Sequence, residues 1–263
     1  MAFAPRTLGR TGITVGPLGL SASYGLGGAD LEWGLDHGCN YMYWGSMRRR
    51  AFRDGLRDLC ARRRDDVCLV LQSYARAGVL VRLSVEKALR ALKVDHADVV
   101  LLGMWQGAPW SGVLEAAQRL REQGKTRFLG VSSHHRPFVG AVVADPATPF
   151  DVVHVRYNAA HRGAEREVFP HRRPEGPGLV SFTATRWGSL LKPQKGEPRT
   201  PTAGDCYRFV LSNPAVDMCL LGPRDGADLR HAVAALEKGP MDDDEARWIR
   251  AVGDRIYSIA MGK

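Results

Sequence analysis

Apolar residues gather in short, nearly continuous runs that recur at regular spacing along the chain. The longer runs cover residues 67–74, 97–104, 127–132, 150–157, 178–185 and 216–222, and two shorter ones cover residues 19–22 and 40–44. Several runs lack the alternation of apolar and polar positions that marks a strand with one wet face. The runs therefore predict strands of a sheet that is covered on both faces.

Segments with helical periodicity separate these runs. Residues 84–94 carry apolar side chains at Val85, Leu89 and Leu92, and residues 112–123 and 228–238 repeat this kind of spacing. Gly124 follows the second segment, at a position where glycine commonly ends a helix. Strand and helix alternate about eight times, which predicts either a parallel barrel or a doubly wound parallel sheet.

Three segments depart from this alternation. Residues 1–18 are predicted to form a short hairpin that caps the floor of the barrel, and residues 192–204 are polar and rich in proline, which predicts an exposed loop. Residues 242–245 are all acidic, as expected for the first turn of a terminal helix. Because 263 residues suit one large α/β unit, we expect a single domain over residues 1–263.

The formal net charge of +9 makes nucleic acid one candidate partner. The basic residues are scattered, however, with local runs at positions 48–50 and 62–64 of one predicted helix, and such runs usually form a solvated helix face. A polyanionic small molecule such as a dinucleotide phosphate needs only one local basic site. We therefore expect a small-molecule ligand and no nucleic acid.

Compartment signals favour the cytoplasm. No stretch of about 18 apolar residues suggests a membrane span, and no apolar segment of the secretory type follows the N-terminus. The cysteines are odd in number and widely spaced, which is typical of reduced thiols. They are Cys39, Cys60, Cys68, Cys206 and Cys219. The sequence does not indicate the oligomeric state.

Five segments, in order along the chain, resemble the aldo-keto reductases. Residues 6–15 are similar to the N-terminal hairpin of that family, and residues 88–100, 124–132 (GKTRFLGVS), 150–158 (FDVVHVRYN) and 207–222 are similar to its strand-forming motifs. The ordered set favours the (β/α)₈ (TIM) barrel of this family, with an N-terminal hairpin and shortened loops, over the doubly wound sheet. In such barrels the active site lies at the C-terminal ends of the strands.

The resemblance implies NADPH-dependent carbonyl reduction. In that family a Tyr donates the proton, a Lys paired with an Asp lowers the pKa of that Tyr, and a His helps to orient the substrate. The positions that match the Asp, Tyr, Lys and His hold Tyr43, Arg48, Gln72 and Gly103. Because a guanidinium keeps its protons up to about pH 12 and an amide carries no charge, we expect the NADP-dependent reaction to be lost or rebuilt.

The cofactor contacts that the resemblance implies are only partly kept. Ser132 and His154 stand where the family holds the nicotinamide amide, and Phe182 stands where an aromatic ring stacks on the nicotinamide. Arg224 resembles a contact to the 2′-phosphate, but Asp228 nearby has the same sign of charge as a phosphate. Whether NADP still binds is left open by the sequence.

Tyr43, Arg48 and His154 are the candidates for a new acid–base chemistry. An unperturbed imidazole titrates near neutral pH, which suits proton transfer. The resemblance places His154 on the amide side of the cofactor, however, away from a reacting carbonyl. Without a neighbouring lysine, a phenol such as that of Tyr43 is a poor proton donor at neutral pH.

Other polar and aromatic residues follow strand ends. Arg186 either contacts an anion or caps the barrel rim. His134 and His135 lack a third ligand at a convincing spacing, so a surface loop is favoured and no metal is expected; His161 is also expected at the surface. Four side chains either line a substrate pocket or fill the end of the barrel. They are Trp44, Gln72, Tyr74 and Trp105.

Three functions are compatible with this pattern. The first is an aldo-keto-reductase-like oxidoreductase whose carbonyl reduction has been lost or rebuilt. The second is an enzyme of changed mechanism that acts on a small molecule without nicotinamide. The third is a non-catalytic ligand-binding or regulatory barrel. Tight NADPH binding would support the first two functions, and a ligand pocket without NADPH binding would favour the last two.

Overall fold

A computed structural model describes residues 3–22, 25–45, 49–194 and 199–260. Parallel strands form a closed barrel in which each strand pairs with the next along the chain and the last pairs with the first. The strands are β3 (Leu18–Ser21), β4 (Tyr41–Trp44), β5 (Cys68–Ser73), β6 (Ala97–Leu102), β7 (Thr126–Ser133), β8 (Val152–Arg156), β9 (Gly178–Phe182) and β10 (Met218–Leu221). The predicted (β/α)₈ barrel is confirmed.

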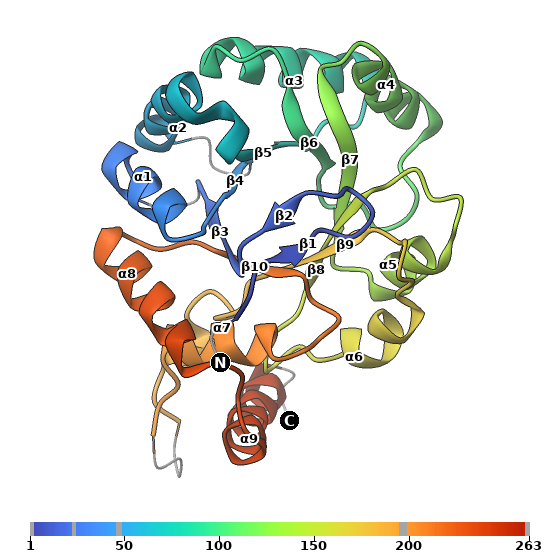
Figure 1. Cartoon of the computed structure of the whole chain (residues 1–263). Helices are drawn as coiled ribbons and strands as arrows, with labels where there is room; N and C mark the ends of the chain where they lie inside the picture. The colour runs from blue at the N-terminus through green and yellow to red at the C-terminus, as the bar shows by residue number, and fades with distance from the viewer. Residues whose placement is uncertain (1–2, 23–24, 46–48, 195–198, 261–263) are drawn as a thin grey trace.

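Helices surround the barrel (Figure 1). They are α1 (Gly28–Asp36), α2 (Arg50–Arg63), α3 (Gly78–Leu92), α4 (Ser111–Glu122), α5 (Arg136–Ala144), α6 (Ala164–Glu167), α7 (Ala203–Leu211), α8 (Gly226–Ala235) and α9 (Asp243–Ala260), with 3₁₀ turns at Arg64–Asp66, Phe169–His171, Ser189–Leu191 and Leu236–Lys238. The backbone N–H of Glu245 donates to Asp242 at the start of α9, as the acidic residues there predicted.

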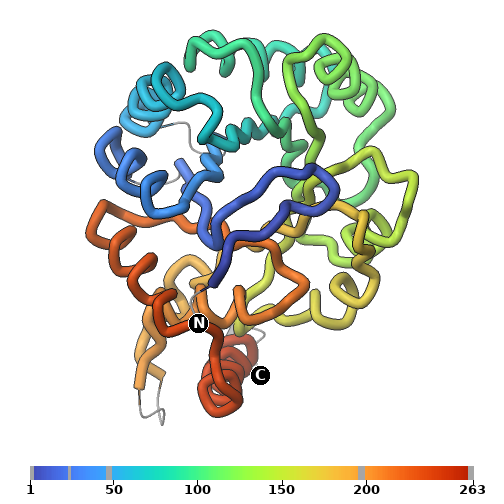
Figure 2. Tube along the Cα trace, viewed as in Figure 1, coloured from blue at the N-terminus to red at the C-terminus, as the bar shows by residue number. Residues whose placement is uncertain are grey.

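The predicted hairpin closes the N-terminal end of the barrel. Its strands β1 (Arg6–Thr7) and β2 (Thr14–Val15) pair antiparallel, and Figure 2 shows them crossing the barrel end. Leu8 and Val15 are fully buried in the cluster that fills the interior. The floor of the barrel is therefore sealed by apolar side chains, and the opposite end is left for a site.

The core has two layers because neighbouring residues of a strand point to opposite faces. Tyr41, Val70 and Val99 belong to the cluster inside the barrel, whereas Met42 and Leu71 belong to the larger cluster between strands and helices. Both layers are apolar, which explains why the strand segments carry no clear alternation in sequence.

Helix α3 differs from its prediction because it begins at Gly78, six residues before the expected start. Its first turns leave Val79, Leu80 and Leu83 about half exposed. Because these apolar residues do not form a buried face, the first turns lack the helical periodicity from which the start of the helix was predicted.

The basic run at 62–64 lies at the end of α2 and the start of the 3₁₀ turn after it, and each of its members has an acidic partner. The guanidinium of Arg62 donates to Glu32, that of Arg63 to Asp66, and that of Arg64 to Asp98. Arg48 lies outside the described residues, and Arg49 directly precedes α2. Arg62 and Arg63 thus form surface ion pairs, which supports the interpretation of a solvated helix face, whereas Arg64 pairs with the buried Asp98.

Candidate functional site

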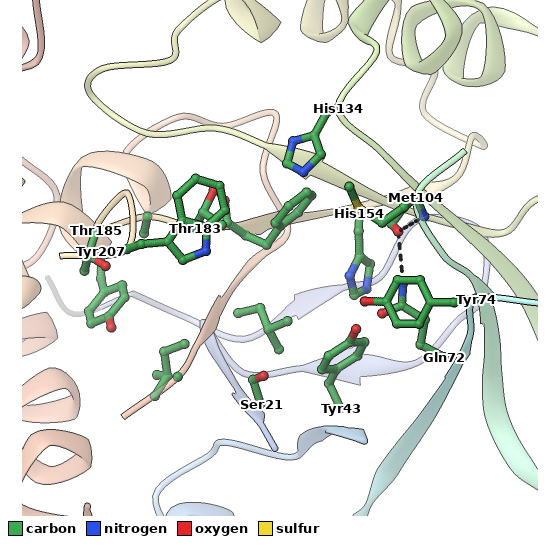
Figure 3. A pocket seen from close by; sticks show the side chains of 17 residues that line it. Ser21, Tyr43, Gln72, Tyr74, Met104, His134, His154, Thr183, Thr185 and Tyr207 are labelled. Atoms are coloured by element: carbon green, nitrogen blue, oxygen red, sulfur yellow. Dashed lines mark hydrogen bonds between the residues drawn. The ribbon is translucent and has the colours of Figure 1, made fainter. Parts of the chain in front are cut away.

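A cavity of about 370 Å³ opens at the C-terminal end of the barrel. Figure 3 shows Tyr43, Gln72, Tyr74 and His154 gathered on one side of it, and Thr183, Thr185 and Tyr207 on the other. Inward-pointing residues near the C-terminal ends of the strands contribute to its floor and walls. These include Ser21, Tyr43, Gln72, Ser132, His154, Phe182 and Leu220.

The pleat of each strand selects these side chains. In β8, Val152 lies in the interior cluster, so His154 and Arg156 follow on the same face. In β5, Val70 lies in the interior, so Gln72 follows it toward the cavity. Tyr43, Gln72 and His154 all line this cavity. Gly103 does not line the cavity itself but lies against Gln72 and Tyr74, which do.

His154 is held beneath the cavity by a buried tyrosine. The imidazole Nε2 lies 2.7 Å from the phenol oxygen of Tyr41, and both residues are buried. Burial lowers the pKa of His154 to about 3, and it raises the pKa of Tyr41 well above its ordinary value, with smaller contributions from Cys68 and Tyr43. His154 is thus neutral at physiological pH, and the expectation that it titrates near neutrality is wrong because the barrel interior desolvates it.

Tyr43 is packed into the cavity wall. Only 6% of it is exposed, and its ring centre lies 5.7 Å from that of His154. Gly45 makes room for its phenol, because a Cβ at that position would lie 2.4 Å from the tyrosine oxygen. Tyr43 therefore has a fixed place beside the cavity.

Gln72 and Ser132 form a small polar network at the next strands. The amide Nε2 of Gln72 donates to the hydroxyl oxygen of Ser132 at 3.2 Å, and the backbone N–H of Met104 donates to the same oxygen at 3.0 Å. A hydroxyl can accept two hydrogen bonds and donate one. These two donors use both acceptor sites of Ser132, so its hydroxyl proton is available to be donated to a ligand.

Gly103 makes room for this network. A Cβ at position 103 would lie 2.1 Å from Nε2 of Gln72 and 2.9 Å from a ring carbon of Tyr74. The amide of Gln72 therefore occupies the space that a side chain at position 103 would need. The two residues form one packing unit across β5 and β6.

Two predicted pocket residues lie elsewhere. Trp44 is buried in the layer between strands and helices, because it neighbours the inward-pointing Tyr43 and so faces outward. Trp105 packs in the same layer, with the guanidinium of Arg76 4.2 Å from its ring centre. Of the four predicted pocket residues, Gln72 and Tyr74 do line the cavity.

The predicted cofactor residues are divided. Ser132, His154 and Phe182 line the cavity. Arg224 does not: its side chain is 79% exposed and donates through Nε and a terminal nitrogen to both carboxylate oxygens of Asp228, at 2.7 and 3.0 Å. This ion pair lowers the pKa of Asp228 and neutralises the cation expected to meet a phosphate. Arg48, the third candidate for acid–base work, lies outside the described residues.

Sequence reasoning missed several lining residues. His134 lies at the cavity mouth and packs edge-on against Phe182, with ring centres 5.2 Å apart. It stands two positions after Ser132, so extending the inward row of β7 by one step would have found it. Burial and Arg156 lower its pKa. Trp187, 66% exposed at the rim, carries no comparable signal.

Two features are absent from the part of the chain that the structure describes. No helix among them is long and apolar enough to cross a bilayer. No group of three or more His, Cys, Asp or Glu side chains in the described ranges is placed to hold a metal ion.

Known proteins with similar sequences are oxidoreductases. The model of the aldo/keto reductase family matches residues 72–205, about half of the chain. Norsolorinic acid reductase A of Aspergillus parasiticus is 31% identical over 119 residues, which cover 43% of this chain and 29% of that protein. The chain thus spans less than a third of that relative. L-galactose dehydrogenase of Arabidopsis thaliana is 23% identical over an alignment that covers 97% of this chain and 95% of that protein.

Solved structures show the same fold. An aldo-keto reductase from Bacillus halodurans in its holo form superposes with a TM-score of 0.78 at 19% identity, over 94% of this chain and 95% of that one. An aldo/keto reductase from Klebsiella pneumoniae, in complex with NADP and acetate, superposes with a TM-score of 0.77 at 19% identity, over 94% of each chain. At this level of identity the likeness establishes the barrel and leaves the chemistry to the residues of this chain.

Proposed function

Because the chain belongs to the aldo/keto reductase family, we propose that its cavity binds a small molecule and that the NADP-dependent carbonyl reduction implied by the family has been lost or rebuilt. One observation carries this proposal. The described residues that line the cavity include neither a lysine nor a carboxylate, and Gln72 stands where the resemblance puts the lysine.

Carbonyl reduction requires a site that can stabilise negative charge on the reacting oxygen. Hydride transfer to a carbonyl builds negative charge on the oxygen, and a positioned donor must meet that charge. Tyr43 is a phenol without a lysine at position 72 to increase its acidity. His154 is neutral and engaged with Tyr41, so it supplies no proton at neutral pH. The described side chains therefore lack an efficient acid for this reaction.

Two other functions remain candidates. An enzyme of changed mechanism is supported by the phenol of Tyr43 at the cavity wall, with Arg48 and His154 as further candidates for acid–base roles. The low pKa of His154 speaks against its part in that mechanism. A non-catalytic binding barrel is supported by the formed cavity and the absence of charged groups among its described lining residues.

The cavity fits part of a nicotinamide cofactor. Phe182 offers a ring face, the hydroxyl of Ser132 retains a proton to donate, and Nδ1 of His154 is the ring nitrogen that Tyr41 does not engage. These groups suit a nicotinamide amide. The pairing of Arg224 with Asp228 does not suit the 2′-phosphate of NADP. When bound, the cofactor would supply a hydride. We propose weak nicotinamide binding without preference for the phosphorylated form.

We also propose that the partner is a small molecule rather than nucleic acid, and that the protein is cytoplasmic. Support for the first comes from the cavity and from the ion pairs of the basic run at 62–64. Support for the second comes from the buried, unpaired thiols of the five cysteines.

Cofactor titration combined with a steady-state assay tests the proposal. Fluorescence titrations with NADPH and NADH are expected to give weak and similar affinities. Assays with a panel of aldehydes and ketones are expected to show no oxidation of either cofactor above the protein-free rate. Tight, NADPH-selective binding accompanied by turnover of any panel member would overturn the proposal.

A further inference from the structure

Two arginines stand at the barrel mouth beside the cavity. Arg156 ends β8 and continues the inward row of Val152 and His154. Its register partner on β9 is Phe182, a lining residue of the cavity. Arg186 lies in the turn after β9, which the amide of Asn158 ties to the end of β8 by donating to the backbone oxygen of Thr183 at 2.8 Å.

The surroundings of these arginines are cationic. Burial, then the charges of Arg136 and Arg186, hold the pKa of Arg156 below its ordinary value, against a smaller opposing effect of Tyr257. Burial and the same three guanidinium groups, with His134, lower the pKa of His161 to about 4. His161 is half-buried against Tyr257, which corrects the expectation of a surface position.

Nearby carboxylates are already engaged with other partners. Glu167 accepts a hydrogen bond from Arg136 at 2.9 Å, Glu165 from Arg250 at 2.7 Å, and Asp254 from Arg162. Among the residues that the structure describes, none forms a hydrogen bond or an ion pair with the guanidinium of Arg156 or Arg186. Both side chains are half-buried, and no carboxylate within the described ranges compensates their charges.

Other arginines with little exposure in this barrel differ from Arg156 and Arg186, because they donate to carboxylates. Arg172 donates to Asp217, Arg208 to Glu245, and Arg64 to Asp98, in partly buried positions. The fold therefore supplies a carboxylate to buried or partly buried guanidinium groups in several places, and the described residues supply none to Arg156 or Arg186. Uncompensated charge at a rim is costly unless a ligand meets it.

The turn that presents Arg186 is strained. Thr183, Arg186 and Trp187 have φ angles of 59°, 50° and 51°, a left-handed region that non-glycine residues rarely adopt. Such strain persists where the surrounding structure enforces it, and it gathers at ligand sites. It places Trp187 at the cavity rim and Arg186 one residue away.

We infer that Arg156 and Arg186 form a subsite for the anionic group of a small organic ligand whose apolar part occupies the cavity. Guanidinium groups bind carboxylate and phosphate oxygens in paired hydrogen bonds, and Phe182, Trp187 and Leu220 provide apolar walls for the remainder. The inference rests on the proposed function, because it names the class of ligand that the cavity takes. Carboxylate and phosphate share this chemistry, and the probes below separate them.

Calorimetric titration with three probes that share a phenyl group tests the subsite: benzoate, phenyl phosphate and neutral benzyl alcohol. The wild-type protein should bind at least one anion about tenfold more tightly than benzyl alcohol, since hydrogen bonds to charged groups contribute roughly that much. Arg156→Met and Arg186→Met should each remove this preference while leaving the affinity for benzyl alcohol unchanged.

Arg119→Met is the matched control, because it removes one positive charge from an exposed position on α4. It should leave all three affinities unchanged, which excludes a general effect of net charge. Thermal unfolding gives a second readout: without ligand, Arg156→Met and Arg186→Met should unfold at the same or a higher temperature than wild type, because each relieves repulsion between like charges. A lower midpoint in both variants would overturn the inference.

The titrations give different results if the ligand cavity is wrong and if only the anion subsite is wrong. Equal affinity for benzoate, phenyl phosphate and benzyl alcohol, unchanged in both variants, would overturn the anion subsite and leave the ligand cavity standing. No binding of any probe would refute the ligand cavity for molecules of this size, and the subsite with it. A preference for phenyl phosphate over benzoate, or the reverse, would support the subsite and identify the anion.

Discussion

The imidazole of His154 is fully enclosed, and its one described hydrogen bond joins it to Tyr41. Burial keeps it neutral, so a side chain that looks like a proton carrier in sequence acts as a packed polar group in the structure. The same contrast holds for Arg224, which looks like a phosphate contact in sequence and is paired with Asp228 in the structure. At the residue scale, the surrounding residues therefore determine whether a side chain can carry a proton or bind a phosphate.

Unfolding at different pH tests the state of His154. Its pKa in the folded protein, about 3, lies below its ordinary value of 6.5, so between these values the unfolded chain binds the proton that the folded chain excludes. Stability should therefore fall as pH falls from 7 toward 5, by up to roughly 1.4 kcal/mol per pH unit from this imidazole. Denaturant unfolding at pH 7, 6 and 5 measures it.

His154→Gln is the comparison variant, since an amide at this position does not titrate and can still bond Tyr41. Its stability should depend less steeply on pH than that of wild type. His161, with a pKa of about 4, should leave some slope in both proteins. An identical slope in wild type and variant would show that His154 is charged or accessible in the folded state.

Asp228→Asn tests whether the ion pair with Arg224 suppresses phosphate recognition. The substitution frees the guanidinium, so affinity for NADPH should rise about two- to fivefold while that for NADH stays unchanged, a range suited to an exposed charge. Cofactor fluorescence measures both. Glu237→Gln, an exposed charge beyond the end of α8, is the control. Strong NADPH preference in the wild type would mean that the phosphate already has a cation.

At the scale of elements, Gly103, which directly follows β6, and Gln72, which lies on the neighbouring strand β5, share one space. Gly103→Ala should destabilise the protein by about 1–3 kcal/mol, the cost of forcing a methyl group into a packed site. The cost should be smaller when Gln72→Ala is also present, because the clashing amide is gone. Chemical denaturation of the two single variants and the double variant measures the coupling.

Gly107→Ala is the control for backbone effects of the added methyl group. It lies in the same loop, and no atom lies within 4 Å of a Cβ built there. Its stability should match that of wild type. If Gly103→Ala costs the same with and without Gln72, the two positions are independent.

The positions of the strands were largely predictable from the sequence, whereas the face of the sheet to which each side chain points was not. All eight strand segments were placed within a few residues, because each is an apolar run bounded by polar positions. Residues 40–44 contain no polar position that marks a face after Asn40, so the sequence could not decide whether Tyr43 or Trp44 points inward. The strand expected over 178–185 ends at Phe182, since the positive φ of Thr183 has no sequence signal.

At the scale of the whole molecule, regular alternation and ordered family-like segments were enough to predict the closed barrel. The site was predicted where strand ends supplied it, as at Gln72, His154 and Ser132. It was missed where it depends on long-range arrangement: that no described carboxylate pairs with Arg156 or Arg186 is a property of several elements together. The pairing of the basic run at 62–64 with acids on other segments is equally invisible in sequence.

We propose above all that the cavity binds a ligand without the acid that carbonyl reduction needs. A single-turnover assay tests it most directly, with protein in excess over NADPH and a panel of aldehydes and ketones, followed by nicotinamide absorbance. Product release then cannot hide the chemical step. We predict decay at the protein-free rate throughout the panel. Oxidation at about 1 per second or faster, abolished in Tyr43→Phe, would contradict the claim and identify Tyr43 as the acid.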